Sequence, residues 1–132
     1  MAKTNELDTG VLWLKLDADS KQLLQKLYPP KYSDPYYDHV TLAFGVPRES
    51  VSHLIGQAAS ANVYAYAHNA KVEAVRVKTS GLPDTYGVPH ITLSTQQGVE
   101  PFESVAMLKG SHQEVPVNPP FELKGQTEFI LL

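Results

Sequence analysis

Two histidines stand at the head of the same four-residue pattern, His-x-Thr-Leu, at separate places in the chain. The first copy is His-Val-Thr-Leu at residues 39–42 and the second is His-Ile-Thr-Leu at residues 90–93. Histidine titrates near neutral pH and can give or take a proton, and a threonine hydroxyl can donate a hydrogen bond. The repeat therefore predicts four catalytic residues: His39, Thr41, His90 and Thr92.

Both copies of the motif have the composition of a short β-strand. Side chains two positions apart in a strand point to the same face, so each histidine shares a face with its threonine. The aliphatic residues of the two motifs point to the opposite face, where we expect the core. If the two strands lie near each other, two imidazoles and two hydroxyls converge on one groove.

Such a groove suits the cleavage of a phosphodiester. One proton must leave the attacking oxygen and one must reach the leaving oxygen, and two histidines in opposite protonation states can move both. The threonine hydroxyls can donate hydrogen bonds to the phosphate oxygens on which charge develops. We expect a bell-shaped dependence of the rate on pH, with no metal and no cofactor.

Composition narrows the classes of protein to which the chain can belong. Its 132 residues fit one domain, and it has no cysteine, which excludes disulfides, thiol nucleophiles and cysteine-bound zinc. A net charge of −3 argues against a protein that coats long nucleic acid. No apolar run reaches membrane-spanning length, and the N-terminus lacks the pattern of a signal peptide. We expect a cytoplasmic monomer that meets a small nucleotide or the end of an RNA.

The elements that must position the motifs mix strands and helices without regular alternation. This mixture predicts an α+β domain over residues 1–132, with mainly antiparallel strands and two halves at about 10–60 and 61–132. Asp17 or Asp19 can cap the first helix, and Pro29 and Pro30 end it. The predicted strands are 11–16, 39–44, 63–67, 71–77 and 90–94, and residues 121–124 with 127–132 supply one or two closing strands. The predicted helices are 20–28, 48–59 and 101–109.

Loops rich in tyrosine precede both motif strands. Tyr36, Tyr37 and Tyr86 lie there and could stack on a base, although ordinary packing is an equally good explanation. Lys15 interrupts an apolar strand and could approach a phosphate. A metal site is the weaker alternative, because the acidic residue beside a motif, Asp38, should point away from His39.

The paired motifs resemble those of the two-histidine (2H) phosphoesterase superfamily, which carries one His-x-Thr/Ser-hydrophobic motif in each of two pseudo-symmetric lobes. The resemblance implies a bilobal α+β fold related by a pseudo-two-fold axis, with the two motif strands side by side in a central cleft. It also implies action on 2′,3′-cyclic phosphates or related RNA linkages. Similar proteins include cyclic phosphodiesterases, ligase-like 2′-5′ RNA enzymes and viral enzymes that destroy cyclic oligonucleotide signals.

The leading hypothesis is a phosphoric diester hydrolase that opens a 2′,3′-cyclic phosphate, a 2′-5′ linkage or a cyclic oligonucleotide by paired-histidine acid–base catalysis. One alternative within the enzyme class is a viral-type enzyme that degrades cyclic oligonucleotide immune signals. From a different class comes a protein that binds a nucleotide without turning it over. The sequence leaves open which histidine is the acid.

Overall fold

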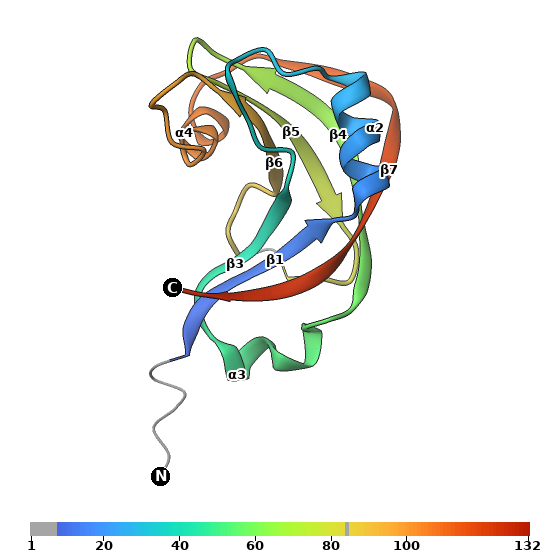
Figure 1. Ribbon diagram of the computed structural model, residues 1–132, viewed down its shortest axis with the longest axis vertical. Coiled ribbons are helices and arrows are strands. Elements are labelled where there is room, and N and C mark those ends of the chain that lie inside the picture. The colour runs from blue at the N-terminus through green and yellow to red at the C-terminus, as the bar shows by residue number, and fades with distance from the viewer. Residues whose placement is uncertain (1–7, 84) are drawn as a thin grey trace.

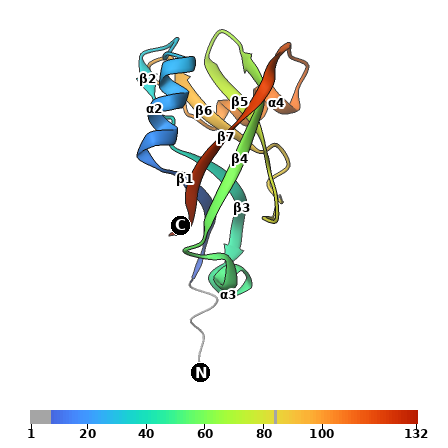
Figure 2. The same ribbon diagram turned by 90° about the vertical axis from the view of Figure 1, so that its right-hand side faces the viewer.

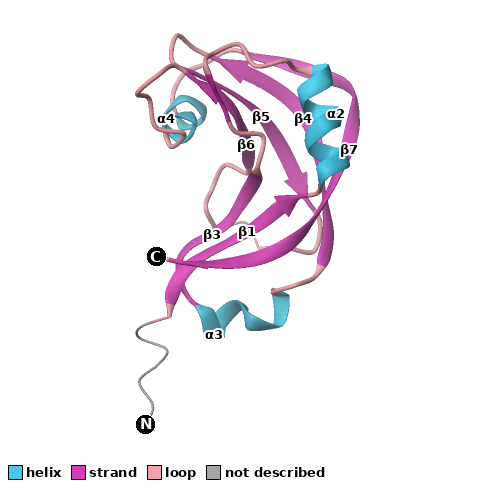
Figure 3. Ribbon diagram, in the orientation of Figure 1, coloured by secondary structure: helices cyan, strands magenta, loops and turns pink. Residues whose placement is uncertain are grey.

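The computed structural model describes residues 8–83 and 85–132, and within these residues it holds one seven-stranded antiparallel sheet and three short α-helices (Figure 3). The predicted α+β class with antiparallel pairing is confirmed. The strands are β1 (Thr9–Leu16), β2 (Asp34–Pro35), β3 (His39–Pro47), β4 (Ala58–His68), β5 (Val72–Thr79), β6 (His90–Thr95) and β7 (Glu114–Leu131). The helices are α2 (Ala18–Leu27), α3 (Arg48–Val51), which runs into a 3-10 turn (Ser52–Leu54), and α4 (Glu103–Lys109).

The first helix, predicted over 20–28, spans Ala18–Leu27, and the capping and proline signals predicted for its ends are present. The side chain of Asp17 accepts a hydrogen bond from the Ser20 backbone N–H at 2.8 Å, which satisfies one of the amides left unpaired at a helix start. Pro29 and Pro30 follow the last turn and cannot continue it. Leu24 is fully buried and anchors α2 against the sheet.

The strand order is β2-β6-β5-β4-β7-β1-β3, and the sheet curls into a half-barrel (Figure 1). Because of this curl, β3 and β6 approach each other although they lie near opposite ends of the order. The curl therefore brings the two motif strands to one region of the molecule.

The two-lobed arrangement predicted by the family resemblance is wrong for this chain. The long strands β4 and β7 lie side by side along the molecule and belong to both halves (Figure 2). Residues 114–116 and 121–126 of β7 pair with β4, and residues 125–131 pair with β1. One continuous sheet thus replaces two separate lobes.

Two predicted boundaries also differ from the structure. The helix predicted for 48–59 is much shorter, because Gly56 has a positive φ of 80° and the chain then enters β4 to pair with β7. The closing segments 121–124 and 127–132, predicted as one or two strands, are the end of one long strand that begins at Glu114. Its first half could not be predicted as a strand because it contains three prolines, which cannot donate backbone hydrogen bonds: Pro116, Pro119 and Pro120. The register of β4 with β7 shifts near them.

The two faces of the sheet are covered by different groups of side chains. The main core covers one face and includes the aliphatic motif residues Val40, Leu42, Ile91 and Leu93, all at most 1% exposed. A smaller apolar cluster packs α4 against β4, β5 and the segment before β6, on the other face of the sheet. The motif histidines and threonines lie on this second face, as the alternation of strand side chains predicts. Within residues 8–83 and 85–132, no helix has the length and apolar character needed to cross a membrane.

Candidate active site

The chain itself ties the two motif strands together. Strand β2 pairs with the end of β6, and the backbone N–H groups of Tyr36 and Tyr37 donate to the carbonyls of Leu93 and Thr92 at 2.8 and 3.1 Å. Asp38 follows Tyr37, and the next residue, His39, begins β3. The segment before one motif is therefore hydrogen-bonded to the strand of the other.

All four motif side chains, His39, Thr41, His90 and Thr92, line one cavity of about 360 Å³. Residues of β1, β3 and β6 line this cavity, and so do residues at the start of α4. Apart from Asp38, the other lining residues are aromatic or aliphatic. They are Val11, Trp13, Tyr36, Phe44, Tyr86, Pro101, Phe102, Val105, Ile130 and Leu132.

His39 is held by contacts on two sides of its ring. Its Nδ1 lies 3.1 Å from Asp38 Oδ2, and its ring stacks on Trp13 with 3.7 Å between the centroids and 15° between the planes. The carboxylate accepts the hydrogen bond, so Nδ1 carries the proton and Nε2 is the atom left for a ligand. Burial lowers the pKa of His39, and the neighbouring Asp38 carboxylate opposes that shift.

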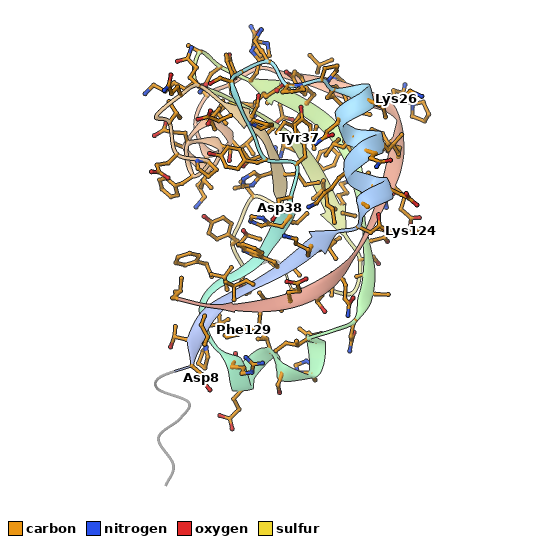
Figure 4. All side chains as sticks on the ribbon, in the orientation of Figure 1. Asp8, Lys26, Tyr37, Asp38, Lys124 and Phe129 are labelled. Atoms are coloured by element: carbon orange, nitrogen blue, oxygen red, sulfur yellow. The ribbon has the colours of Figure 1, made fainter. Side chains whose placement is uncertain are left out.

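Asp38 lies where the loop enters β3, near the end of β1 (Figure 4). It forms ion pairs with two lysines in addition to its contact with the histidine. Lys15 and Lys21 place their Nζ atoms 2.9 and 3.0 Å from Asp38 Oδ1. Burial alone would raise the pKa of this carboxyl, but the hydrogen bonds from Lys15, Lys21 and His39 outweigh it and lower the pKa to about 2. The carboxylate therefore stays charged at physiological pH.

The prediction that Asp38 points away from His39 is wrong. Asp38 precedes the first strand residue, so the alternation of a strand does not fix its direction. Its hydrogen bonds with two lysines and the histidine decide its orientation instead.

His90 is the more enclosed of the two histidines, with 7% of its surface exposed. Its Nδ1 donates to the Val88 carbonyl at 2.6 Å, and its Nε2 lies 2.8 Å from the Ser104 hydroxyl on α4. Burial lowers the pKa of His90; the Val88 carbonyl opposes the shift and the nearby positive charge of Arg76 adds to it. Neutral His90 thus keeps its proton on Nδ1 and presents a lone pair at Nε2.

Ser104 joins the two members of the second motif and was not found from the sequence. Its hydroxyl lies 2.9 Å from Thr92 Oγ1 and 2.7 Å from the Pro101 carbonyl oxygen, in addition to His90. A serine in the first turn of a short predicted helix carries no motif. Only the packing of α4 on β6 places it there.

Two of the three predicted tyrosines line the cavity and one does not. Tyr36 and Tyr86 do, and Tyr86 lies 6.0 Å from Phe44 between ring centroids. The expectation that Tyr37 reaches over the groove is wrong: its side chain is fully buried and its hydroxyl donates to the Tyr28 carbonyl at 2.6 Å (Figure 4). Its backbone φ of 50° turns it away from the path of Tyr36.

Lys15 holds Asp38 instead of lining the cavity. Trp13 lies in the predicted strand 11–16 but belongs to no motif, and it supplies the ring that packs on His39. No group of three or more His, Asp or Glu side chains in residues 8–83 and 85–132 is arranged to hold a metal ion. Neither a scan of protein-family models nor a search of curated proteins finds a match to the chain.

Proposed function

We propose that the chain is a metal-independent phosphodiesterase of the two-histidine type, acting on a cyclic or RNA-type phosphodiester. The observation that carries this proposal is the convergence of His39, Thr41, His90 and Thr92 on one cavity. Both histidines have Nδ1 occupied by a hydrogen-bond acceptor, so both would work through Nε2. The repeated motif and its resemblance to the 2H superfamily point to the same chemistry.

The surroundings of the two rings favour different roles. His39 has a carboxylate at Nδ1, which stabilises its imidazolium form and suits a general acid. His90 has an uncharged carbonyl there and the positive charge of Arg76 nearby, which favours the neutral form and suits a general base. Water would lose its proton toward His90, and the leaving oxygen would receive one from His39 Nε2.

The threonines would bind the phosphate while these protons move. Thr41 and Thr92 lie on the same strand faces as the histidines and line the same cavity. Each hydroxyl can donate to a non-bridging oxygen, where negative charge increases in the transition state.

The cavity walls favour a small substrate with one phosphate. Aromatic rings from Trp13, Tyr36, Phe44, Tyr86 and Phe102 offer stacking surfaces for a base. Among the described residues that line the cavity, none is a lysine or arginine that could hold a second phosphate. For these reasons we propose a 2′,3′-cyclic mononucleotide as the first choice of substrate and a cyclic oligonucleotide as the second.

A protein that binds a nucleotide without cleaving it is the alternative class. The observation in its favour is that Ser104 covers the Nε2 atom of an almost buried His90. Such a protein would retain its ligand unchanged when either histidine is replaced.

The deciding experiment is product analysis by mass spectrometry, in EDTA, with 2′,3′-cyclic mononucleotides, 2′-5′ oligoadenylate and cyclic di- and trinucleotides offered in parallel. We expect turnover by the wild type and a loss of about 10²- to 10⁴-fold in His39→Asn and in His90→Asn. His53→Asn, at an exposed histidine outside the cavity, is the matched control and should keep full activity. Binding without turnover of any linkage would favour the binding protein.

A further inference from the structure

The Ser104 hydroxyl holds a position that the proposed reaction has not yet used. It is fully buried and lies within hydrogen-bond distance of three groups: His90 Nε2 at 2.8 Å, Thr92 Oγ1 at 2.9 Å and the Pro101 carbonyl oxygen at 2.7 Å. Of the two side chains that it joins, His90 is almost closed to solvent, whereas Thr92 is only partly buried. Ser104 is therefore an inner link between the histidine and a hydroxyl at the cavity.

The direction of the hydrogen bonds at Ser104 depends on the charge of His90. Because Nδ1 donates to the Val88 carbonyl, neutral His90 has a lone pair at Nε2 that can accept the Ser104 proton. Protonated His90 donates from Nε2 instead, and the serine proton turns to the Pro101 carbonyl or to Thr92. Both charge states are satisfied by rotation of a hydroxyl, with no movement of heavier atoms.

We propose that Ser104 is a positioning residue that relays a proton between His90 and the cavity through Thr92. This inference rests on the proposed function. In the base direction, the attacking water gives a proton to Thr92 Oγ1, the threonine proton passes to Ser104 Oγ, and the serine proton passes to His90 Nε2. The net change is one proton moved from water to the imidazole, and both hydroxyls are regenerated.

The relay explains how an enclosed histidine can serve a substrate in the cavity. In the relay, the Thr92 hydroxyl contacts the attacking water and passes its proton to Ser104 in place of a contact with the phosphate. Thr41 alone then donates to a non-bridging phosphate oxygen. Removing either hydroxyl of the relay should then interrupt the same path, so the two losses should not add.

Kinetics of Ser104→Ala, Thr92→Val and the double variant test the relay on the linkage that the wild type cleaves. We expect kcat to fall about 10²-fold in each single variant, with little change in KM, and to fall no further in the double variant. Ser104→Thr, which keeps the hydroxyl, should recover most of kcat, and Ser111→Ala at an exposed serine should behave as wild type. In mixtures of H₂O and D₂O the wild-type rate should show the curvature of several protons in flight, and Ser104→Ala should lose it.

A second measurement needs no substrate. The ¹⁵N resonance of Nε2 in neutral His90 should report a hydrogen-bonded lone pair in the wild type and a free one in Ser104→Ala. No change in that resonance, or full kcat in Ser104→Ala beside an active wild type, would overturn the relay alone. Absence of turnover by the wild type would overturn the proposed function and the relay with it.

Discussion

Replacing Asp38 by asparagine should destabilise the protein by an amount that depends on pH. The pKa of this carboxyl is lowered from 3.8 to about 2 by Lys15, Lys21 and His39. At about 1.4 kcal/mol per pKa unit, this shift corresponds to about 2.5 kcal/mol at most. With 26% of the side chain exposed, solvent screening reduces the expected loss to about 1 kcal/mol at pH 7.

The sign of the pH dependence follows from the lowered pKa. A carboxyl with a lower pKa in the folded state contributes its stability above the unfolded value of 3.8, and loses it as the pH falls through the folded value of about 2. Wild type and Asp38→Asn should therefore differ at pH 7 and converge as the pH falls from 4 toward 2.

Urea unfolding, followed by the fluorescence of Trp13, the one tryptophan of the chain, measures this difference. Asp19→Asn is the matched control, because Asp19 is an exposed aspartate on α2, and its free energy of unfolding should change by no more than about 0.5 kcal/mol. An equal stability of wild type and Asp38→Asn at pH 7, or a difference that stays constant down to pH 3, would refute the reasoning.

Three further predictions concern the surroundings of the cavity. Trp13 fluorescence should rise as His39 loses its proton, because a stacked imidazolium quenches the indole. The midpoint of this rise should lie below pH 6.5, because the pKa of His39 is lowered. The same titration of His39→Asn should be flat. Acidification from pH 7 to 5 should lower the free energy of unfolding of His90→Asn by less than it lowers that of the wild type, as measured by urea unfolding. The reason is that a histidine with a lowered pKa in the folded state contributes stability above pH 6.5, and this stability is lost on acidification. Glu73→Gln should lower the free energy of unfolding by about 2–3 kcal/mol in the same assay, because the buried Glu73 side chain accepts three hydrogen bonds. Glu128→Gln, at an exposed glutamate, is the control and should change it by less than about 0.5 kcal/mol.

The part of the site that could be predicted is the part encoded by short-range pattern. Strand alternation places His39 with Thr41 and His90 with Thr92, and it sends the aliphatic residues between them to the core. These relations hold within a few residues, so they need no knowledge of the tertiary fold. The capped start of α2 at Asp17 could be predicted for the same reason.

The residues that were missed depend on contacts between distant elements. Ser104 reaches His90 only because α4 packs on the sheet, and Trp13 reaches His39 only because β1 and β3 are neighbours in register. Asp38 lies at the junction of a loop and a strand, where alternation does not apply. A single sequence carries no signal for such placements.

Long-range pairing also decided the errors in the fold. Residues 58 and 59 belong to the predicted helix, but they join β4 because a partner strand, β7, is available beside them. The bilobal expectation failed in the same way. The motifs repeat in the sequence, whereas the sheet that carries them is continuous across both halves.

The position of β1 between β3 and β7 has a consequence for the order of folding. The β4–β5 hairpin joins segments close in sequence, whereas β1 pairs residues such as Gly10 with Leu131 from the opposite end of the chain. Closing so long a loop is slow, so β1 should find its second partner late. In pulsed hydrogen exchange during refolding, the β1 amides that bond to β7 should gain protection after those of β4 and β5. The stack of Trp13 on His39 needs only β1 and β3, which lie closer together in the sequence. A refolding chain should therefore hold its first candidate catalytic histidine before the C-terminal strand closes the sheet.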